Sequence, residues 1–409
     1  MRYVIIGGSA AAIGCIEGVR SVDKTGEIIL ITGETEWNYS RPLISYLLEG
    51  KTTRDKMWCR PDSFFTRNGV TVKAGVLATA LDAGDRTVRL STGERLAYDR
   101  LLAATGSRPF VPPIPGLETV ERTFCFQTLS DASALAEALR PESRVLILGA
   151  GLTGVKCAEG IRGLCAQIAI ADLAPRVLPA VLDDTAAAMV QARMEEKGVR
   201  FYLNDSAAAF RGNTARLQSG TELEFDVLVT AVGVRPNTQL VADAGGAVDR
   251  GILVDGRCAT TLPDVYAAGD CAQGYDAVSG EKRMLPLWPN AVLQGETAGI
   301  NMAGGKASFD RAIPMNAIGF MGLHIITAGT YDGETYVHRD GENYKILFYK
   351  DDVLKGYILI GDVARAGIYT ALIRNRTPLS SIDFKLICEK PQLMAFTART
   401  RRDLLSKQQ

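Results

Sequence analysis

The stretch Val145–Gly154 constrains the fold of this chain more than any other, because a run of apolar, β-prone residues leads directly into a glycine-rich turn. The turn has the spacing G-x-G-x-x-G, with glycines at Gly149, Gly151 and Gly154. The first glycine permits the tight turn, the second lets the backbone approach a pyrophosphate, and the third lets the following helix pack closely on the strand. The helix N-terminus then directs free N–H groups at the phosphates. The stretch therefore predicts a strand, a turn and a helix that bind a dinucleotide.

A second predicted strand, 168–172, ends in the acid Asp172. In nucleotide-binding folds of this type, a carboxylate at the end of the second strand binds the hydroxyls of the adenosine ribose. A 2′-phosphate would meet a like charge there, so Asp172 predicts a preference for NADH over NADPH. A glycine-rich turn alone is weak evidence, but strand, turn, helix, strand and acid in this order favour a nucleotide site over a structural role.

The same arrangement occurs at the N-terminus in an imperfect form. Strand 2–6 leads into a turn in which Gly7 is followed by Ser9 at the second glycine position and Ala12 at the third. Alanine is accepted at the third position, whereas Ser9 must still allow a phosphate to approach. Glu34 follows the next predicted strand and is the candidate ribose ligand of this unit. The edge of any parallel sheet remains an alternative explanation for this segment taken alone.

An internal repeat relates the two units. Residues 90–109 match residues 217–236 without a gap, and leucine, glycine, leucine, aspartate, glycine, arginine and proline recur at identical offsets. Each copy predicts a polar hairpin that leads into a buried strand, which closes its unit by returning to the parallel sheet. The repeat therefore predicts two related dinucleotide folds in one chain.

Segment 264–270 predicts a further buried strand, which ends in Gly269 and Asp270. The first unit lacks a last strand of its own, so we expect this segment to return to the first sheet and make that domain discontinuous. Asp270 would then lie at the carboxyl end of a parallel strand, where ligands bind in such folds.

The expected architecture is an α/β fold with two Rossmann-like dinucleotide-binding domains and a small C-terminal α+β domain. A stiff, proline-rich passage at 109–116 marks a crossing between domains. Alternating apolar residues at 344–349 and 353–360 predict two antiparallel strands, followed by a helix over 364–374. The predicted boundaries are 1–112 with 241–309 for the discontinuous first domain, 113–240 for the inserted second domain, and 310–409 for the third.

The balance of charge and the spacing of cysteines argue against several functional classes. The chain has 46 basic and 46 acidic residues, which gives no reason to expect nucleic acid or an anionic membrane as a partner. No segment reaches the ~18 consecutive apolar residues of a transmembrane helix, and we expect a cytoplasmic protein. None of the eight cysteines forms a C-x-x-C pair and the chain has two histidines, so no metal site is expected.

On these motifs the chain resembles the pyridine nucleotide-disulfide oxidoreductase superfamily. The resemblance rests on the two glycine turns and on four short motifs: Arg41-Pro42, Ala104-Thr105-Gly106, Gly233 with Arg235-Pro236-Asn237, and Ala268-Gly269-Asp270. It implies that the first domain binds FAD and the inserted domain binds NAD(P)H. The stretch Trp37–Ser45 is most similar to the branch of rubredoxin reductase, ferredoxin reductase and apoptosis-inducing factor.

The resemblance also implies roles for individual residues. Asp270 is expected to bind the ribityl or phosphate region of FAD, and Thr105 and Gly106 are expected to contact the adenine half. The further cofactor-binding residues expected from the motifs are Arg41, Pro42, Gly233 and Gly269.

The stretch 287–301 has a proline near a helical start, as expected for the first turn of a helix. The resemblance implies that this helix points its N-terminus at the flavin pyrimidine ring, where the helix dipole stabilises the negative charge of the reduced flavin. Trp288 and Asn290 are therefore candidate flavin contacts. A buried aromatic residue at a domain junction is an equally good explanation of Trp288.

Departures from the family pattern reduce the number of reactions expected of this chain. Relatives that reduce disulfides or peroxides carry a redox cysteine near the flavin, but no cysteine lies between Cys15 and Cys59. A C-terminal histidine base is also absent, because no histidine follows His338. Thiol-disulfide chemistry is therefore not expected, and direct electron transfer from flavin to an acceptor remains.

Two positions depart together from the family pattern. In many relatives a lysine follows the Arg-Pro-Pro-Leu-Ser motif, a glutamate follows the second glycine turn two residues on, and the two side chains pair beside flavin N5. Here these positions hold Tyr46 and Lys156. We predict that the positive charge is kept but supplied by Lys156, which reaches towards the isoalloxazine or Tyr46. A lysine extended along a helix surface to water is the alternative.

The resemblance and the departures together predict an FAD-dependent NADH oxidoreductase. Hydride would pass from NADH to flavin N5, and electrons would pass to a separate acceptor such as rubredoxin or a ferredoxin-like iron–sulfur protein. Two alternatives stay open: an NADH oxidase that reduces oxygen or a small molecule directly, and a nucleotide-sensing interaction protein with slow turnover. A homodimer is compatible with the sequence, which does not identify the acceptor.

Overall fold

A computed structural model describes residues 1–406, which divide into two compact units. The first unit comprises residues 1–176, 197–275 and 282–312, and the second comprises 177–196, 276–281 and the chain from residue 313. Both glycine turns lie in the first unit, so the domain boundaries expected within it stay a prediction. None of the helices in the described residues has the length and low polarity needed to cross a membrane.

The first parallel sheet contains the N-terminal strand and a strand that returns from far along the chain. Its order is β19 (Val265–Ala267), β7 (Arg100–Ala103), β1 (Arg2–Ile6), β2 (Glu27–Thr32) and β3 (Val70–Ala74). Strand β19 pairs with β7 in parallel, which confirms that the segment before Asp270 returns to this sheet. Both faces of β1 and β2 are buried, as expected for a parallel sheet covered on both sides.

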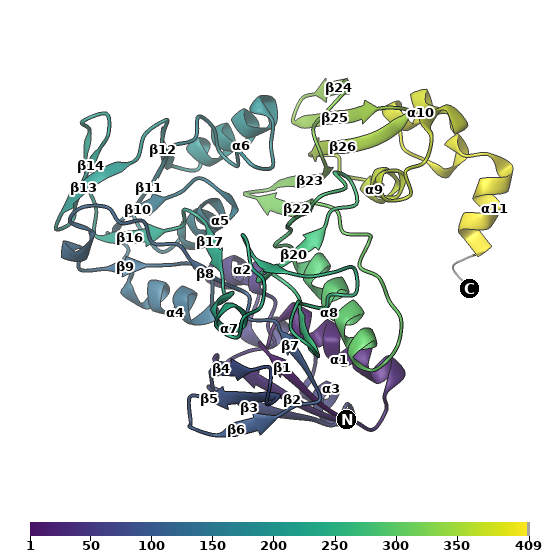
Figure 1. Cartoon of the computed structure of the whole chain (residues 1–409). Coiled ribbons are helices and arrows are strands. Elements are labelled where there is room, and N and C mark those ends of the chain that lie inside the picture. The colour runs from purple at the N-terminus through teal and green to yellow at the C-terminus, as the bar shows by residue number, and fades with distance from the viewer. Residues whose placement is uncertain (407–409) are drawn as a thin grey trace. The chain divides into compact units, whose positions relative to one another are not determined.

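One face of the first sheet is covered by two helices that lie side by side, α1 (Ala10–Val22) and α8 (Trp288–Met302) (Figure 1). Their backbones approach closely at glycines of both helices. A Cβ atom added to Gly14 would lie 2.1 Å from the carbonyl oxygen of Val292, and one added to Gly299 would lie 2.2 Å from that of Cys15. Side chains at these positions would therefore force the helices apart.

The second parallel sheet follows the same plan around the complete glycine turn. Its order is β12 (Val199–Leu203), β11 (Gln167–Asp172), β10 (Arg144–Leu148), β16 (Val227–Thr230) and β9 (Thr123–Phe124). Helix α5 (Leu152–Ile161) begins at the turn that follows β10. The strand, turn, helix and strand predicted from this stretch are confirmed.

The internal repeat corresponds to equivalent strands in the two halves. Each half has a three-stranded antiparallel sheet: β4 (Ala78–Asp82), β5 (Thr87–Leu90) and β6 (Arg95–Ala97), and β13 (Ala207–Arg211), β14 (Thr214–Leu217) and β15 (Glu222–Glu224). The last strands of the two repeats, β8 (Ser107–Pro109) and β17 (Val234–Pro236), pair with each other antiparallel. The repeated sequence therefore also connects the two halves directly.

Shorter elements complete the first unit. The helices are α2 (Ile44–Leu48), α3 (Asp62–Arg67), α4 (Leu129–Ala138) and α7 (Gln239–Asp243), with 3-10 turns η1 (Arg41–Leu43), η2 (Arg54–Lys56) and η3 (Leu117–Thr119). A further small sheet contains β18 (Ile252–Leu253), β20 (Ala272–Tyr275) and β21 (Lys282–Met284).

The second unit is built on a five-stranded antiparallel sheet. Its order is β22 (Met315–Phe320), β23 (Leu323–Gly329), β26 (Val353–Ile360), β25 (Asn343–Lys350) and β24 (Glu334–Asp340). Its helical elements are α6 (Asp184–Glu196), α9 (Ala366–Arg374), η4 (Leu379–Ser381), α10 (Phe384–Glu389), η5 (Leu393–Ala395) and α11 (Ala398–Ser406). The sequence predicted β25, β26 and α9 but missed the other three strands. One of these, β24, is largely exposed and lacks apolar alternation.

We predict that Gly299→Ala lowers the free energy of unfolding by about 1–3 kcal/mol, because the new methyl group would overlap the backbone of α1. Urea denaturation measures this change. Gly367→Ala is the control, because a Cβ there meets no atom within 4 Å and alanine favours the helix α9. The same unfolding midpoint for Gly299→Ala and wild type would show that the α1–α8 contact tolerates side chains.

Candidate functional site

The helices that follow the two glycine turns begin without side-chain caps. Ser9 is the N-cap residue of α1 and Gly151 that of α5, and neither position has a side-chain capping hydrogen bond. Helix α4 differs, because Thr128 and Asp131 form a complete capping box at its start. The first amides of α1 and α5 are thus available to an anion such as a phosphate.

The three glycines of the second turn have different surroundings. A Cβ on Gly149 would lie 2.4 Å from the carbonyl oxygen of Ala231, and one on Gly154 would lie 2.0 Å from that of Gly149. A Cβ on Gly151 meets no atom within 4 Å. The first and third glycines are therefore required by packing, whereas the second borders open space, as a pyrophosphate site needs.

The first turn is packed in a similar way. A Cβ on Gly7 would lie 2.0 Å from the carbonyl oxygen of Ala104, and Ala12 is buried. Ser9 is partly exposed at the start of α1. The substitution of alanine for the third glycine is thus accommodated within the core.

Asp172 lies against the second glycine turn. Its carboxylate accepts the amide N–H of Ala150 at 2.5 Å and that of Ala174 at 2.7 Å. Because the N–H of Ala150 belongs to the turn, the carboxylate is held at the edge where a bound dinucleotide would place its adenosine ribose.

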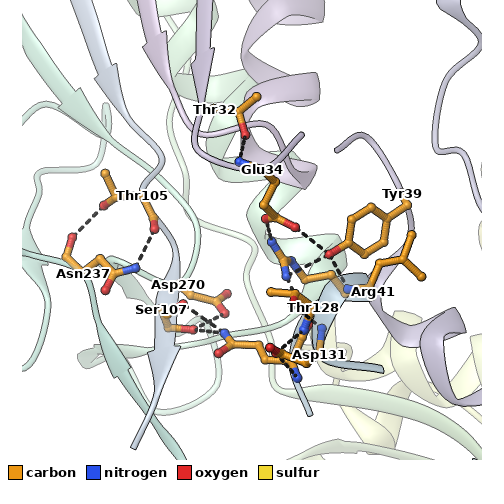
Figure 2. A network of polar contacts seen from close by, with 12 residues as sticks. Thr32, Glu34, Tyr39, Arg41, Thr105, Ser107, Thr128, Asp131, Asn237 and Asp270 are labelled. Carbon is orange, nitrogen blue, oxygen red and sulfur yellow. Dashed lines mark hydrogen bonds and ion pairs between the residues drawn. The ribbon is translucent and has the colours of Figure 1, made fainter. Parts of the chain in front are cut away.

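Glu34 belongs to a polar network at the corresponding edge of the first sheet (Figure 2). It forms an ion pair with Arg41 and accepts a hydrogen bond from the Tyr39 hydroxyl at 2.7 Å. The Tyr39 hydroxyl also accepts the amide N–H of Leu129, and Arg41 donates to the carbonyl oxygen of Gln127 at 3.1 Å. The candidate ribose ligand of this half is therefore oriented by residues from both halves. Pro42 occupies the first turn of η1, directly after Arg41.

Asp270 lies at the end of β19 in the same region (Figure 2). Its carboxylate accepts a hydrogen bond from the Ser107 hydroxyl at 3.1 Å, and Gln127 donates to the same hydroxyl. Burial raises the pKa of the Asp270 carboxyl, while the Ser107 hydrogen bond and the charge of Arg41 act in the opposite direction. Nothing local in the sequence marks Ser107 or Gln127, because their positions depend on long-range packing.

Thr105 is held by reciprocal hydrogen bonds with Asn237. Its hydroxyl donates to the Asn237 carbonyl oxygen at 2.6 Å, and the Asn237 side-chain amide donates to the Thr105 carbonyl oxygen at 2.9 Å. The adjoining Gly106 has φ of +64° and borders open space. Gly233, with φ of +113°, accepts the amide N–H of Phe110. The predicted motifs at 104–106 and 233–237 therefore lie together where β8 pairs with β17.

Three buried polar atoms near these residues lack partners within residues 1–406: Oε1 of Gln127, Nε1 of Trp288 and Nε2 of Gln294. Trp288 and the buried Asn290 lie in the first turn of α8, which has no side-chain cap. The Gly269 amide donates to Gln294 of the same helix at 2.8 Å. A dinucleotide carries hydroxyl, carbonyl and phosphate groups. These groups would provide partners for the unpaired polar atoms, for the free amides of the uncapped helices and for the Asp270 carboxylate.

Tyr46 and Lys156, the two departures from the family pattern, are in contact. The Lys156 ammonium lies 4.1 Å from the centroid of the Tyr46 ring, and it forms an ion pair with Glu159. The Lys156 ammonium therefore lies against the Tyr46 ring, and its side chain is only 15% exposed. Glu159 was not among the predicted site residues, although its i,i+3 spacing from Lys156 is a local signal for such an ion pair.

All eight cysteines are free thiols. Burial raises the thiol pKa of seven of them: Cys15, Cys59, Cys157, Cys165, Cys258, Cys271 and Cys388. A redox-active thiol needs a lowered pKa and access to solvent. Within residues 1–406, no three acidic, cysteine or histidine side chains are grouped to hold a metal ion.

Comparison with known proteins shows the family. Residues 1–295 match the pyridine nucleotide-disulphide oxidoreductase family, and residues 314–377 match the rubredoxin NAD+ reductase C-terminal domain. The chain is 32% identical over 399 residues to the NADH-dependent phenylglyoxylate dehydrogenase subunit epsilon of Aromatoleum evansii, with 94% of each chain covered. It is 29% identical over 310 residues to the rubredoxin-NAD(+) reductase of Pseudomonas putida, with 74% of this chain and 80% of that protein covered.

The fold is similar to that of a solved structure, the covalent complex of putidaredoxin reductase and putidaredoxin. The TM-score is 0.86 at 22% identity, with 99% of this chain and 98% of the matched chain covered. Some other curated relatives are longer, and this chain spans 48% of their length. The chain belongs to the pyridine nucleotide-disulphide oxidoreductase family of FAD-dependent NAD(P)H oxidoreductases.

Proposed function

We propose that this chain binds FAD in its first half and NADH in its second, and passes electrons to a small rubredoxin or ferredoxin-like iron–sulfur protein. The observation that supports this most is the repeated arrangement of an uncapped helix after a glycine turn, with a carboxylate at the end of the next strand. FAD, when bound, supplies the acceptance of hydride and the release of electrons. The protein supplies the orientation of the two nucleotides.

Each half contributes its own ligands to this proposal. In the first half, the residues that would hold FAD are Gly7, Ser9, Ala12, Glu34, Arg41, Pro42, Thr105, Gly106, Gly269, Asp270, Trp288 and Asn290. In the second half, the residues that would hold NADH are Gly149, Gly151, Gly154, Asp172 and Gly233. Tyr46 and Lys156 would lie where the nicotinamide approaches the flavin.

The proposed acceptor rests on relatives and on the thiols. One relative is named rubredoxin-NAD(+) reductase, and residues 314–377 match the C-terminal domain of such reductases. Thiols with raised pKa values do not favour a disulfide relay, so direct transfer from the flavin to a protein acceptor is the simpler route.

The purified protein should be yellow, contain one FAD per chain, and be bleached by anaerobic NADH faster than by NADPH. NADH oxidation should then be assayed against rubredoxin, ferredoxin, oxygen and disulfides, with the highest kcat/KM expected for an iron or iron–sulfur protein. Oxygen as the fastest acceptor would instead indicate an NADH oxidase. A stable NADH complex with very slow turnover would indicate a nucleotide-sensing protein, and colourless protein that cannot be reconstituted with FAD would exclude the proposal.

Asp172→Asn should lower the ratio of kcat/KM for NADH to that for NADPH by about tenfold, which corresponds to ~1.4 kcal/mol, because a carboxylate that repels a 2′-phosphate becomes neutral. Asp226→Asn is the matched control. Asp226 bonds Arg144 at the opposite end of the same sheet, so its loss should affect stability and not the cofactor ratio. An unchanged ratio in Asp172→Asn would show that Asp172 does not read the ribose.

Alanine at Cys15 or Cys59 should leave flavin reduction and acceptor turnover within a few-fold of wild type. Iodoacetamide at pH 8 should also label Cys165 and Cys388 slowly, because burial raises the pKa of each thiol to about 11 and little thiolate forms. Mass spectrometry reports the labelling, and stopped-flow absorbance reports the turnover. Loss of turnover with FAD retained would reveal a thiol relay.

A further inference from the structure

The buried carboxylate of Glu159 lies at the junction between helices α2 and α5. Its side chain is 2% exposed, and it is ion-paired with Lys156 one turn earlier on α5. A buried carboxylate is costly unless a cation and hydrogen bonds compensate it. The ion pair therefore restricts where the Lys156 ammonium can lie.

The Lys156 ammonium also contacts the opposite helix. It lies 4.1 Å from the centroid of the Tyr46 ring on α2, within the range of a cation–π interaction. The two helices approach closely, since a Cβ on Gly160 would lie 2.9 Å from the carbonyl oxygen of Ser45. The ammonium is thus held between a carboxylate of its own helix and an aromatic ring of the other.

A second ion pair lies near Tyr46 but is more exposed. The Lys51 ammonium is 5.8 Å from the centroid of the Tyr46 ring and 2.7 Å from Glu49. The pKa of Lys51 is raised mainly by its hydrogen bond to Glu49, with a smaller contribution from the charge of Glu159. The Lys51 side chain is 50% exposed, so water screens its charge.

The position of this junction connects the two nucleotide-binding halves. Helix α5 begins at the complete glycine turn, and α2 follows directly after η1, which contains Arg41. A charge buried between these helices is poorly screened.

We propose that Glu159 is a positioning residue that acts through Lys156. It fixes the ammonium against Tyr46, so that the cluster Tyr46–Lys156–Glu159 keeps the two nucleotide-binding halves in register and sets the net charge at their junction near zero. This inference rests on the proposed FAD and NADH sites. It adds to them Glu159, which lies outside the two family positions held here by Tyr46 and Lys156.

The net charge at the junction should affect the flavin midpoint potential, whereas a purely structural role of Glu159 would leave the potential unchanged. Reduction of FAD by hydride adds negative charge, so a net positive junction favours the reduced form and a net negative junction disfavours it. Glu159→Gln removes a negative charge beside Lys156 and should raise the flavin midpoint potential. Lys156→Met removes the positive charge and should lower the potential. The double variant should return close to wild type.

Three measurements on these proteins and on the control Lys51→Met test the inference. Dye-coupled titration measures the flavin potential, and the control should shift it least because Lys51 is half in water. Anaerobic stopped-flow separates the limiting rate of flavin reduction, expected to fall about tenfold in Glu159→Gln, from the NADH dissociation constant, expected to change little. Thermal unfolding of FAD-free protein gives the loss of stability in each variant. The losses in the two single variants should add up to more than the loss in the double variant, because each single change removes one partner of a buried ion pair and keeps the other.

The outcomes separate this inference from the proposed function. Potentials that stay unchanged, or that shift in the same direction in Glu159→Gln and Lys156→Met, would overturn the positioning role while leaving FAD and NADH binding intact. Absence of bound FAD or of reduction by NADH in the wild type would overturn the proposed function itself. If Glu159→Gln does not fold, Lys156→Arg provides the second test. Arginine keeps the positive charge, so the flavin potential should stay close to that of wild type. A shift as large as that of Lys156→Met would count against the inference.

Discussion

The contact between the backbones of α1 and α8 closes the first half of the chain's first unit, and the remaining architecture depends on it. The chain leaves the first sheet after β7, builds the whole second half, and then returns through β19 and α8. Such a return costs chain entropy, which extensive packing must offset. Glycines on both helices let the backbones meet with no side chain between them, so that a large contact area is gained where the chain rejoins itself.

The same return brings the functional groups of distant segments to one edge of the sheet. Gly269 and Asp270 follow shortly after the end of β19, and Gln294 of α8 accepts the Gly269 amide N–H. Asp270 in turn accepts a hydrogen bond from Ser107, which begins the strand that pairs with the second half. Gln294 therefore belongs both to the helix whose packing closes the domain and to the polar network that would contact the cofactor.

The sequence predicted the parts of the fold that are encoded locally. The glycine turns, the strands around them and the returning strand could be identified because parallel strands are continuously apolar and glycine spacing is specific. Strand β24 was missed because both of its faces are largely exposed. Gln127 was missed for a different reason: its position depends on segments packed from elsewhere in the chain, and no local pattern reports it. Glu159 could have been identified as a partner of Lys156 from its i,i+3 spacing, but its burial depends on the packing of α2 against α5.

The two halves hold their candidate ribose carboxylates in different ways, although their sequences repeat. Asp172 is fixed by amides of its own turn and of the residues that follow it. Glu34 is fixed by Tyr39 and Arg41, which in turn bond to Leu129 and Gln127 of the other half. Displacement of Glu34 would therefore disturb contacts between the halves, whereas displacement of Asp172 would disturb only contacts around its own turn.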